Sequence, residues 1–153
     1  LEELGFEAGG VEIDQQAANQ ARANGLTVFQ GPLQSYEPTR PLRLVVAWGL
    51  MMLPEAGGVE DVAGLGGQWI VANWRTPENS FVTEGQREPM RFSPDGVGEV
   101  NIATDNHLNG LRYRVFEQRA CHYPGYERVA MRHLRIEQRG EVNAWYQTVH
   151  RKR

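Results

Sequence analysis

The sequence predicts an α/β fold, with a parallel sheet in its first half and an antiparallel β extension in its second half. Up to about residue 74, short apolar segments of strand length alternate with helical or loop connections, which is typical of βαβ units. From about residue 75, turn signals separate shorter alternating segments, which favours antiparallel strands. We therefore expect two regions, residues 1–74 and residues 75–153.

The first region opens with a strand, a helix and a second strand. Residues 8–13 (AGGVEI) have strand character, and Asp14 is a suitable N-cap for the helix that follows. The helix is rich in alanine and glutamine, and Gly25 provides a left-handed stop. Residues 26–30 (LTVFQ) are then expected to form the second strand.

Two further strands complete the expected parallel sheet. Residues 42–48 (LRLVVAW) are almost continuously apolar, as in strands buried on both faces of a parallel sheet. Residues 57–66 predict a poor helix or a connecting loop. Residues 67–74 (GQWIVANW) predict the fourth strand.

The second region begins with a polar connection and a turn. Residues 93–96 (SPDG) have proline and glycine at positions typical of a β-turn. Residues 97–104 alternate as a strand, residues 106–110 (NHLNG) predict another turn, and residues 111–119 predict a strand. The apolar face of that last strand is expected to consist of Leu111, Tyr113 and Val115.

The last long segment, residues 126–150, predicts a hairpin that turns near Arg139 and Gly140. The apolar positions change phase along its first strand, so we expect a β-bulge near Arg132 or His133. Across the turn, alternate residues share one face.

Length and composition indicate an ordinary globular protein. The chain has 153 residues, of which 41% are hydrophobic and 23% charged, and it has no apolar run long enough for a membrane span. A single cysteine, Cys121, excludes an internal disulfide framework. We expect a cytoplasmic protein.

Charge is unevenly distributed along the chain. Residues 1–66 have a net charge of −6, whereas residues 111–153 have ten basic and four acidic residues, a net charge of +6. We interpret the basic segment as a solvated strand surface, because its arginines are spread along strands. A surface that binds anions or nucleic acid is the alternative.

An acidic residue at the end of the first predicted strand points to a ligand site. Ligands of parallel α/β sheets bind at the carboxyl ends of the strands. A carboxylate there can accept hydrogen bonds from the two vicinal hydroxyls of a ribose. Glu12 is placed for this role, next to the helix cap Asp14.

The segment ELGFEAGGVEIDQQAANQARANGLTVFQGPLQSY resembles the region after the glycine-rich loop of class I S-adenosylmethionine-dependent methyltransferases. In that family, the corresponding strand ends in the acid that binds the adenosyl ribose. The resemblance implies that Glu12 binds the ribose, and that Gly31, Pro32 and Leu33 lie beside the adenine.

Two later segments extend the resemblance to about residues 1–74. LRLVVAWGLMMLPE is similar to the fourth strand of the family, which implies that Trp48 and Gly49 pass near the methionine end of the cofactor. LGGQWIVANW resembles the fifth strand. The resemblance implies a Rossmann-like fold, S-adenosylmethionine as cofactor and a small-molecule methyl acceptor, with residues 75–153 as a substrate-side insertion.

The chain also departs from the family pattern. The glycine-rich loop would precede Leu1, and the last helix and strand of the fold are missing after residue 153. Pro32 stands where the family usually has aspartate, and Arg43 stands where aspartate often begins the fourth strand. We therefore expect an internal fragment or a degenerate member that binds the cofactor weakly or not at all.

Other chemistry is poorly supported by the sequence. The four histidines have no metal-ligand spacing, so no metal site is predicted. His107 lies in a polar turn, where it is either a general base or simply a solvated residue. Cys121 and His122 are neighbours that would face opposite ways on a strand. The aromatic residues of the second half either line an apolar pocket or fill the core: Tyr113, Tyr123, Tyr126, Trp145 and Tyr146.

Two alternatives come from other classes of protein. GGQWIV and the FSPDG turn are also similar to lipocalin-like barrels, in which case residues 65–153 form a ligand-binding barrel. A plain interaction domain would pair through a sheet edge, which also favours homo-oligomers. Parallel strands at 8–13, 26–30, 42–48 and 68–73 in one sheet favour the methyltransferase, whereas a closed barrel from Gln68 would refute it.

Overall fold

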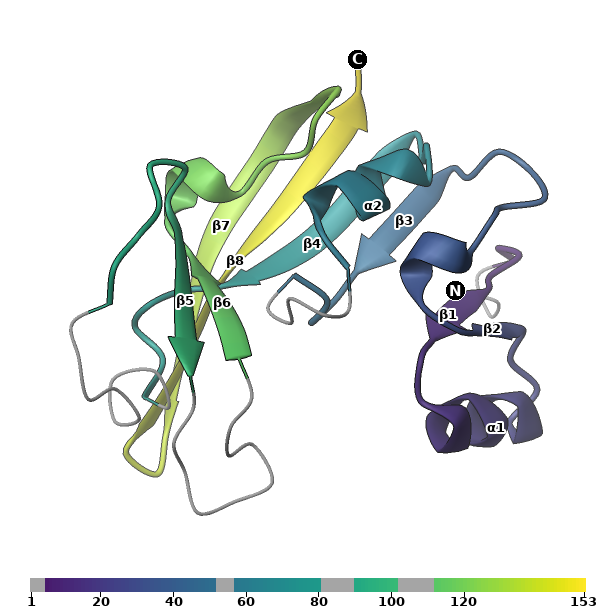
Figure 1. Cartoon of the computed structure of the whole chain (residues 1–153), viewed down its shortest axis with the longest axis horizontal. Helices are drawn as coiled ribbons and strands as arrows, with labels where there is room; N and C mark the ends of the chain where they lie inside the picture. The colour runs from purple at the N-terminus through teal and green to yellow at the C-terminus, as the bar shows by residue number, and fades with distance from the viewer. Residues whose placement is uncertain (1–4, 52–56, 81–89, 102–111) are drawn as a thin grey trace. The chain divides into compact units, whose positions relative to one another are not determined.

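The computed structural model describes residues 5–51, 57–80, 90–101 and 112–153 (Figure 1). The chain forms two compact units, Leu1–Arg40 and Pro41–Arg153. Among the described residues, no helix combines the length and the apolar character needed to cross a bilayer.

The first unit is a small βαβ motif. Strand β1 (Gly10–Glu12) leads into helix α1 (Gln15–Ala23), which returns the chain to strand β2 (Val28–Gln30). The two strands pair in parallel, as predicted. The expected N-cap is confirmed, because the Asp14 carboxylate accepts a hydrogen bond of 2.7 Å from the Ala17 N–H.

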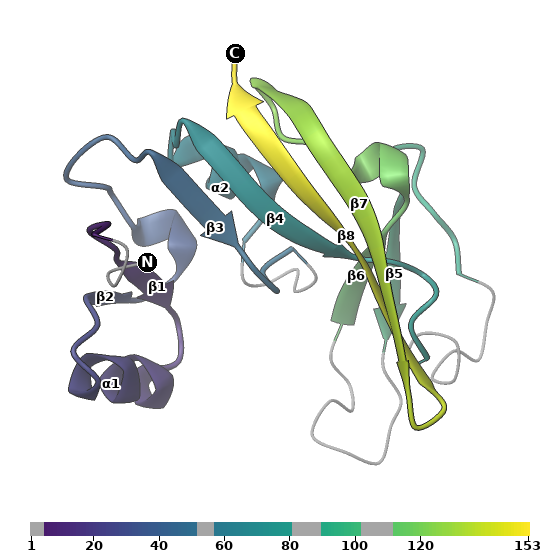
Figure 2. The same ribbon diagram turned by 180° about the vertical axis from the view of Figure 1, so that it is seen from behind.

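A mixed four-stranded sheet forms most of the second unit. Strand β3 (Leu44–Ala47) and strand β4 (Trp69–Arg75) pair in parallel across helix α2 (Val59–Gly64), so they form a second βαβ motif. Strands β7 (Tyr126–Gln138) and β8 (Glu141–Lys152) extend the sheet in antiparallel fashion, in the order β3-β4-β8-β7. Helix α2 lies against one face of the β3–β4 pair (Figures 1 and 2).

The expectation that residues 42–48 are buried on both faces is wrong. Burial alternates along β3, where Val45 and Ala47 are buried while Leu44 and Val46 are 42% and 51% exposed. Within the described part of this unit, β3 is an edge strand and α2 covers only one of its faces. The apolar run therefore reflects the preference of its residues for strands, and not burial of both faces of β3.

A separate antiparallel ribbon consists of β5 (Val97–Asn101) and β6 (Arg112–Phe116). The predicted turn before β5 is confirmed by a 2.9 Å hydrogen bond from the Gly96 N–H to the Ser93 carbonyl. The ribbon packs on the sheet through Phe116, whose ring centroid lies 5.1 Å from that of Trp74 on β4. Residues 102–111, which include the predicted turn at 106–110, His107 and Leu111, lie outside the described residues.

The hairpin β7–β8 turns at Arg139 and Gly140, as predicted, and both residues have positive φ angles (55° and 81°). The bulge lies between Arg128 and Ala130, not near Arg132 or His133. The predicted position is wrong because most of β7 is exposed, so its apolar residues do not mark one buried face.

The strand pairing distinguishes between the alternatives that the sequence left open. The two parallel pairs β1–β2 and β3–β4 exist, but they belong to separate sheets. In the described part of the chain, the strands from Trp69 onward form no closed antiparallel barrel, because β4 pairs in parallel with β3. The fold is thus mixed α/β with an antiparallel extension.

Candidate functional site

The carboxylate of Glu12 lies at the carboxyl end of β1 and is held by the backbone. Its Oε1 accepts a hydrogen bond of 2.9 Å from the Asp14 N–H, at the start of α1. Its main-chain carbonyl accepts a bond of 2.9 Å from the Gly31 N–H, just after β2. One carboxylate oxygen is therefore positioned by the chain, and Oε2 has no hydrogen-bond partner among the described residues.

Three further predicted residues follow β2, beside Glu12. Gly31 is buried, and a Cβ there would lie 2.9 Å from Cε1 of the Phe29 ring, so a larger residue would displace that ring. Pro32 is exposed and precedes the 3-10 turn Leu33–Ser35, in which Leu33 is 9% exposed. The structure thus brings together the four predicted cofactor residues of the first unit.

The remaining two predicted residues, Trp48 and Gly49, follow β3 in the second unit. The Trp48 side chain is 56% exposed. Gly49 has a φ of 72°, a conformation that costs other residues roughly 1–2 kcal/mol. Its N–H donates a hydrogen bond of 2.6 Å to Oδ1 of Asn73 on β4, which fixes the path of the chain after the strand.

A large cavity of about 590 Å³ opens in the second unit. Its volume is typical of a small-molecule site. Its lining combines apolar side chains with several carboxylates, and within it Arg114 lies 3.6 Å from Glu99. The principal lining residues are Met51, Glu60, Ser93, Asp95, Val97, Glu99, Arg114, Phe116 and His122.

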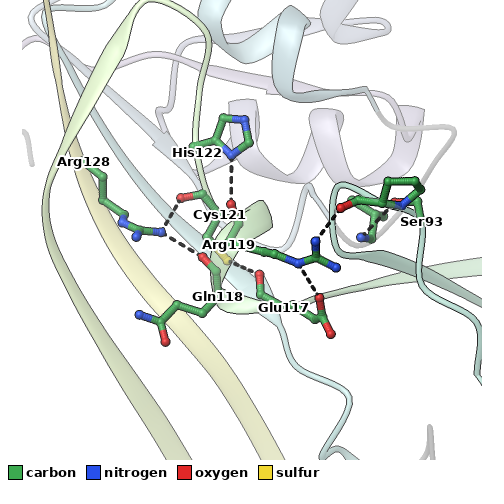
Figure 3. Close-up of polar contacts among 9 residues, drawn as sticks. Ser93, Glu117, Gln118, Arg119, Cys121, His122 and Arg128 are labelled. Carbon is green, nitrogen blue, oxygen red and sulfur yellow. Dashed lines mark hydrogen bonds and ion pairs between the residues drawn. The ribbon is translucent and has the colours of Figure 1, made fainter.

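Among the described residues that line this cavity, His122 is the one histidine. Its Nδ1 lies 3.1 Å from the Arg119 carbonyl, which can only accept a hydrogen bond (Figure 3). In the neutral ring, Nδ1 therefore carries the hydrogen, and the lone pair of Nε2 is left to accept a proton.

Cys121 does not form a couple with the neighbouring histidine. Its side chain is fully buried, and its Sγ lies 3.5 Å from the Glu117 carbonyl, away from the carbonyl that His122 contacts (Figure 3). Burial raises the pKa of the Cys121 thiol to about 12, with the charge of Arg128 opposing that rise. The thiol is therefore protonated near neutral pH and is a poor nucleophile.

The aromatic residues of the second half mainly build the core. Tyr113, Tyr123 and Tyr126 are each at most 8% exposed, and the Tyr126 hydroxyl donates a bond of 2.7 Å to the Gly67 carbonyl. Among the described residues, no group of three histidine, cysteine or carboxylate side chains has the arrangement of a metal site.

Sequence reasoning missed the cavity residues Asp95, Glu99 and His122. Asp95 belongs to the turn that the sequence predicted, and Glu99 points from the strand that follows it. The sequence signal for these residues was the density of polar residues beside predicted turns. That density does not show that distant segments meet around one cavity.

No family model matches the chain, and no curated protein matches it. Among solved structures, the chain is similar to an S-adenosylmethionine-dependent methyltransferase from Clostridium acetobutylicum ATCC 824, with 10% identity and a TM-score of 0.56, over 97% of this chain and 76% of that one. It also matches the glycopeptide N-methyltransferase MtfA in complex with (S)-adenosyl-L-homocysteine, with 16% identity and a TM-score of 0.48, over 95% and 73%. The first likeness shows that the chain has a methyltransferase-like fold.

Proposed function

We propose that this chain binds S-adenosylmethionine and is all or part of a methyltransferase that acts on a small molecule. The observation that carries the proposal is the carboxylate of Glu12, held at the carboxyl end of a parallel strand in a methyltransferase-like fold. The two βαβ motifs support a Rossmann-like arrangement.

The residues of the first unit fit the adenosyl part of this cofactor. The Asp14 N–H occupies one oxygen of Glu12, and Oε2 remains to accept from a ribose hydroxyl. The backbone of Gly31 and the side chain of Leu33 would flank the adenine. Pro32 contributes neither a carboxylate nor an N–H, so we expect weaker cofactor binding than an aspartate would give.

Trp48 and Gly49 are our candidates for contacts to the methionine part of the cofactor. The large cavity is our candidate for the methyl acceptor, because its volume suits a small molecule. The cofactor supplies an electrophilic methyl group, so the protein contributes mainly proximity and orientation. His122 would accept a proton at Nε2 from an acceptor N–H or O–H group.

The test is calorimetric titration with S-adenosylhomocysteine of the wild-type chain, Glu12→Gln and Glu37→Gln. Glutamine keeps the shape of Glu12 but loses the charge and the free acceptor, so we expect binding at least about tenfold weaker. Glu37 is an exposed acid of the same unit, and its variant should bind like the wild type. Absence of saturable binding by the wild type, or equal binding by Glu12→Gln, would contradict the proposal.

A further inference from the structure

A second cavity, which we call the basic cavity, lies at the start of β7 in the second unit. It has a volume of about 450 Å³. Its lining comes from the segment 119–126, from Arg128 on β7 and from Arg153 after β8. Three of these residues are arginines, and no aspartate or glutamate is among the described residues that line it.

Several arginines of the basic C-terminal segment are neutralised by nearby glutamates. Arg114 pairs with Glu99 at 3.6 Å, Arg135 with Glu137 at 3.1 Å, and Arg151 with Glu127 at 2.9 Å. Each of these pairs is neutral, so it leaves no free positive charge on the strand surface. The alternative, an anion-binding surface, therefore has to rest on arginines that lack a carboxylate partner.

Arg128 is such an arginine. Its Nη1 donates to the carbonyl oxygens of Gln118 and Cys121, at 2.9 Å and 3.0 Å (Figure 3). In the described part of the chain it forms no ion pair, so its full positive charge remains. Two bonds from one nitrogen orient the guanidinium, while Nε and Nη2 remain as donors.

Arg119 adds a second, partly neutralised guanidinium at the rim of the basic cavity. Its Nε donates to Glu117 at 2.7 Å and its Nη1 donates to the Pro94 carbonyl at 2.5 Å (Figure 3). These bonds hold the side chain in one orientation and leave Nη2 as a donor.

Tyr123 is an aromatic core residue on the inner side of the lining of the basic cavity. It lines the basic cavity and is 1% exposed, and its hydroxyl has no hydrogen-bond partner among the described residues. Burial raises the pKa of this hydroxyl, so it remains a donor at neutral pH. Tyr123 and Arg128 thus line the same cavity, and a guanidinium without a carboxylate partner suits an oxyanion.

We propose that the basic cavity binds the oxyanion group, carboxylate or phosphate, of a small molecule, with Arg128 as the principal contact. A cavity of this size with one oriented guanidinium suits a single anionic group rather than the extended backbone of a nucleic acid. This goes beyond methyl transfer, because recognition of the anion does not require the cofactor.

The test follows backbone amide shifts of residues 118–128 during titration with inorganic phosphate and, separately, with citrate, at constant ionic strength. We expect saturable shifts for the wild type and for the control Arg135→Ala, whose arginine has its own glutamate on the same strand. Arg128→Ala should bind about tenfold more weakly, which corresponds to the loss of a charge-assisted hydrogen bond. A preference between the two probes distinguishes a phosphate from a carboxylate group.

Arg128→Lys is a second variant, which keeps the test decisive if Arg128→Ala fails to fold. Lysine retains the positive charge but not the planar arrangement of donors. We expect intermediate affinity and an unchanged thermal midpoint in the absence of anion. Linear, non-saturating shifts, or equal affinity of Arg128→Ala and wild type, would overturn the proposal. So would tight, salt-sensitive binding of a single-stranded oligonucleotide without saturation by phosphate. Binding of S-adenosylhomocysteine, measured on the same samples, keeps this result separate from that for the proposed function.

Discussion

His150 provides a direct test of how the core of the second unit is packed. The side chain is fully buried on β8, with its ring centroid 4.9 Å from that of Tyr123 and 6.5 Å from that of Trp74. Burial, followed by the positive charges of Arg128 and His122, lowers the pKa of His150 to about 4. The folded protein therefore keeps this imidazole neutral where an exposed histidine would be charged.

The sign and size of the effect on stability follow from linkage. Because the folded-state pKa lies below the unfolded value of about 6.5, the unfolded chain takes up the proton first. The contribution of His150 to stability is complete above pH 6.5 and is lost as the pH falls through 4. At 1.36 kcal/mol per pH unit, this difference corresponds to a loss of about 3 kcal/mol.

The assay is urea unfolding between pH 4 and pH 7.5 for the wild type, His150→Phe and the control His133→Gln. Phenylalanine cannot be protonated, so we expect His150→Phe to lose about 3 kcal/mol less than the wild type over this range. His133 is partly exposed and lies 3.6 Å from Glu78, and its variant should retain the steep wild-type dependence. Parallel pH profiles for the wild type and His150→Phe would refute this reasoning.

Three further predictions concern single side chains. Thr148→Val should destabilise the fold by about 1–3 kcal/mol in thermal or urea unfolding, because the buried Trp74 indole loses its acceptor at 2.7 Å; Thr148→Ser should largely retain stability, and equal loss in both variants would show that the hydroxyl is unimportant. Cys121 should react with a disulfide reagent at pH 8 only after denaturation, because burial raises its pKa to about 12; rapid native-state labelling would contradict the buried position. Asp14→Ala should cost about 1 kcal/mol of unfolding free energy through loss of the bond from the Ala17 N–H; Asp14→Asn should recover most of it, and an unchanged Asp14→Ala would argue against the cap.

The features that the sequence predicted correctly depend on neighbouring residues. The cap at Asp14, the turn at 93–96 and the hairpin turn at Arg139 and Gly140 are each encoded within a few positions. Local chemistry selects these conformations before any distant contact forms. They were therefore accessible without a structure.

The features that the sequence did not predict depend on distant parts of the chain. Which face of β3 is buried depends on where α2 lies, and the apolar letters of LVVA are the same in either case. The large cavity collects Glu60, Asp95 and His122 from three separate segments, and the basic cavity depends on which arginines find a carboxylate. Strand-end carboxylates such as Glu12 are the exception, because strand order alone places them.

The most direct test of cofactor binding is a ¹H–¹⁵N amide titration of the chain with S-adenosylhomocysteine. We predict that the amides of Glu12, Gly31 and Leu33 shift along one saturation curve, and that this response disappears in Glu12→Gln. Unchanged amides at these strand ends, or shifts confined to the β7–β8 hairpin, would contradict a cofactor site at the carboxyl ends of β1 and β2.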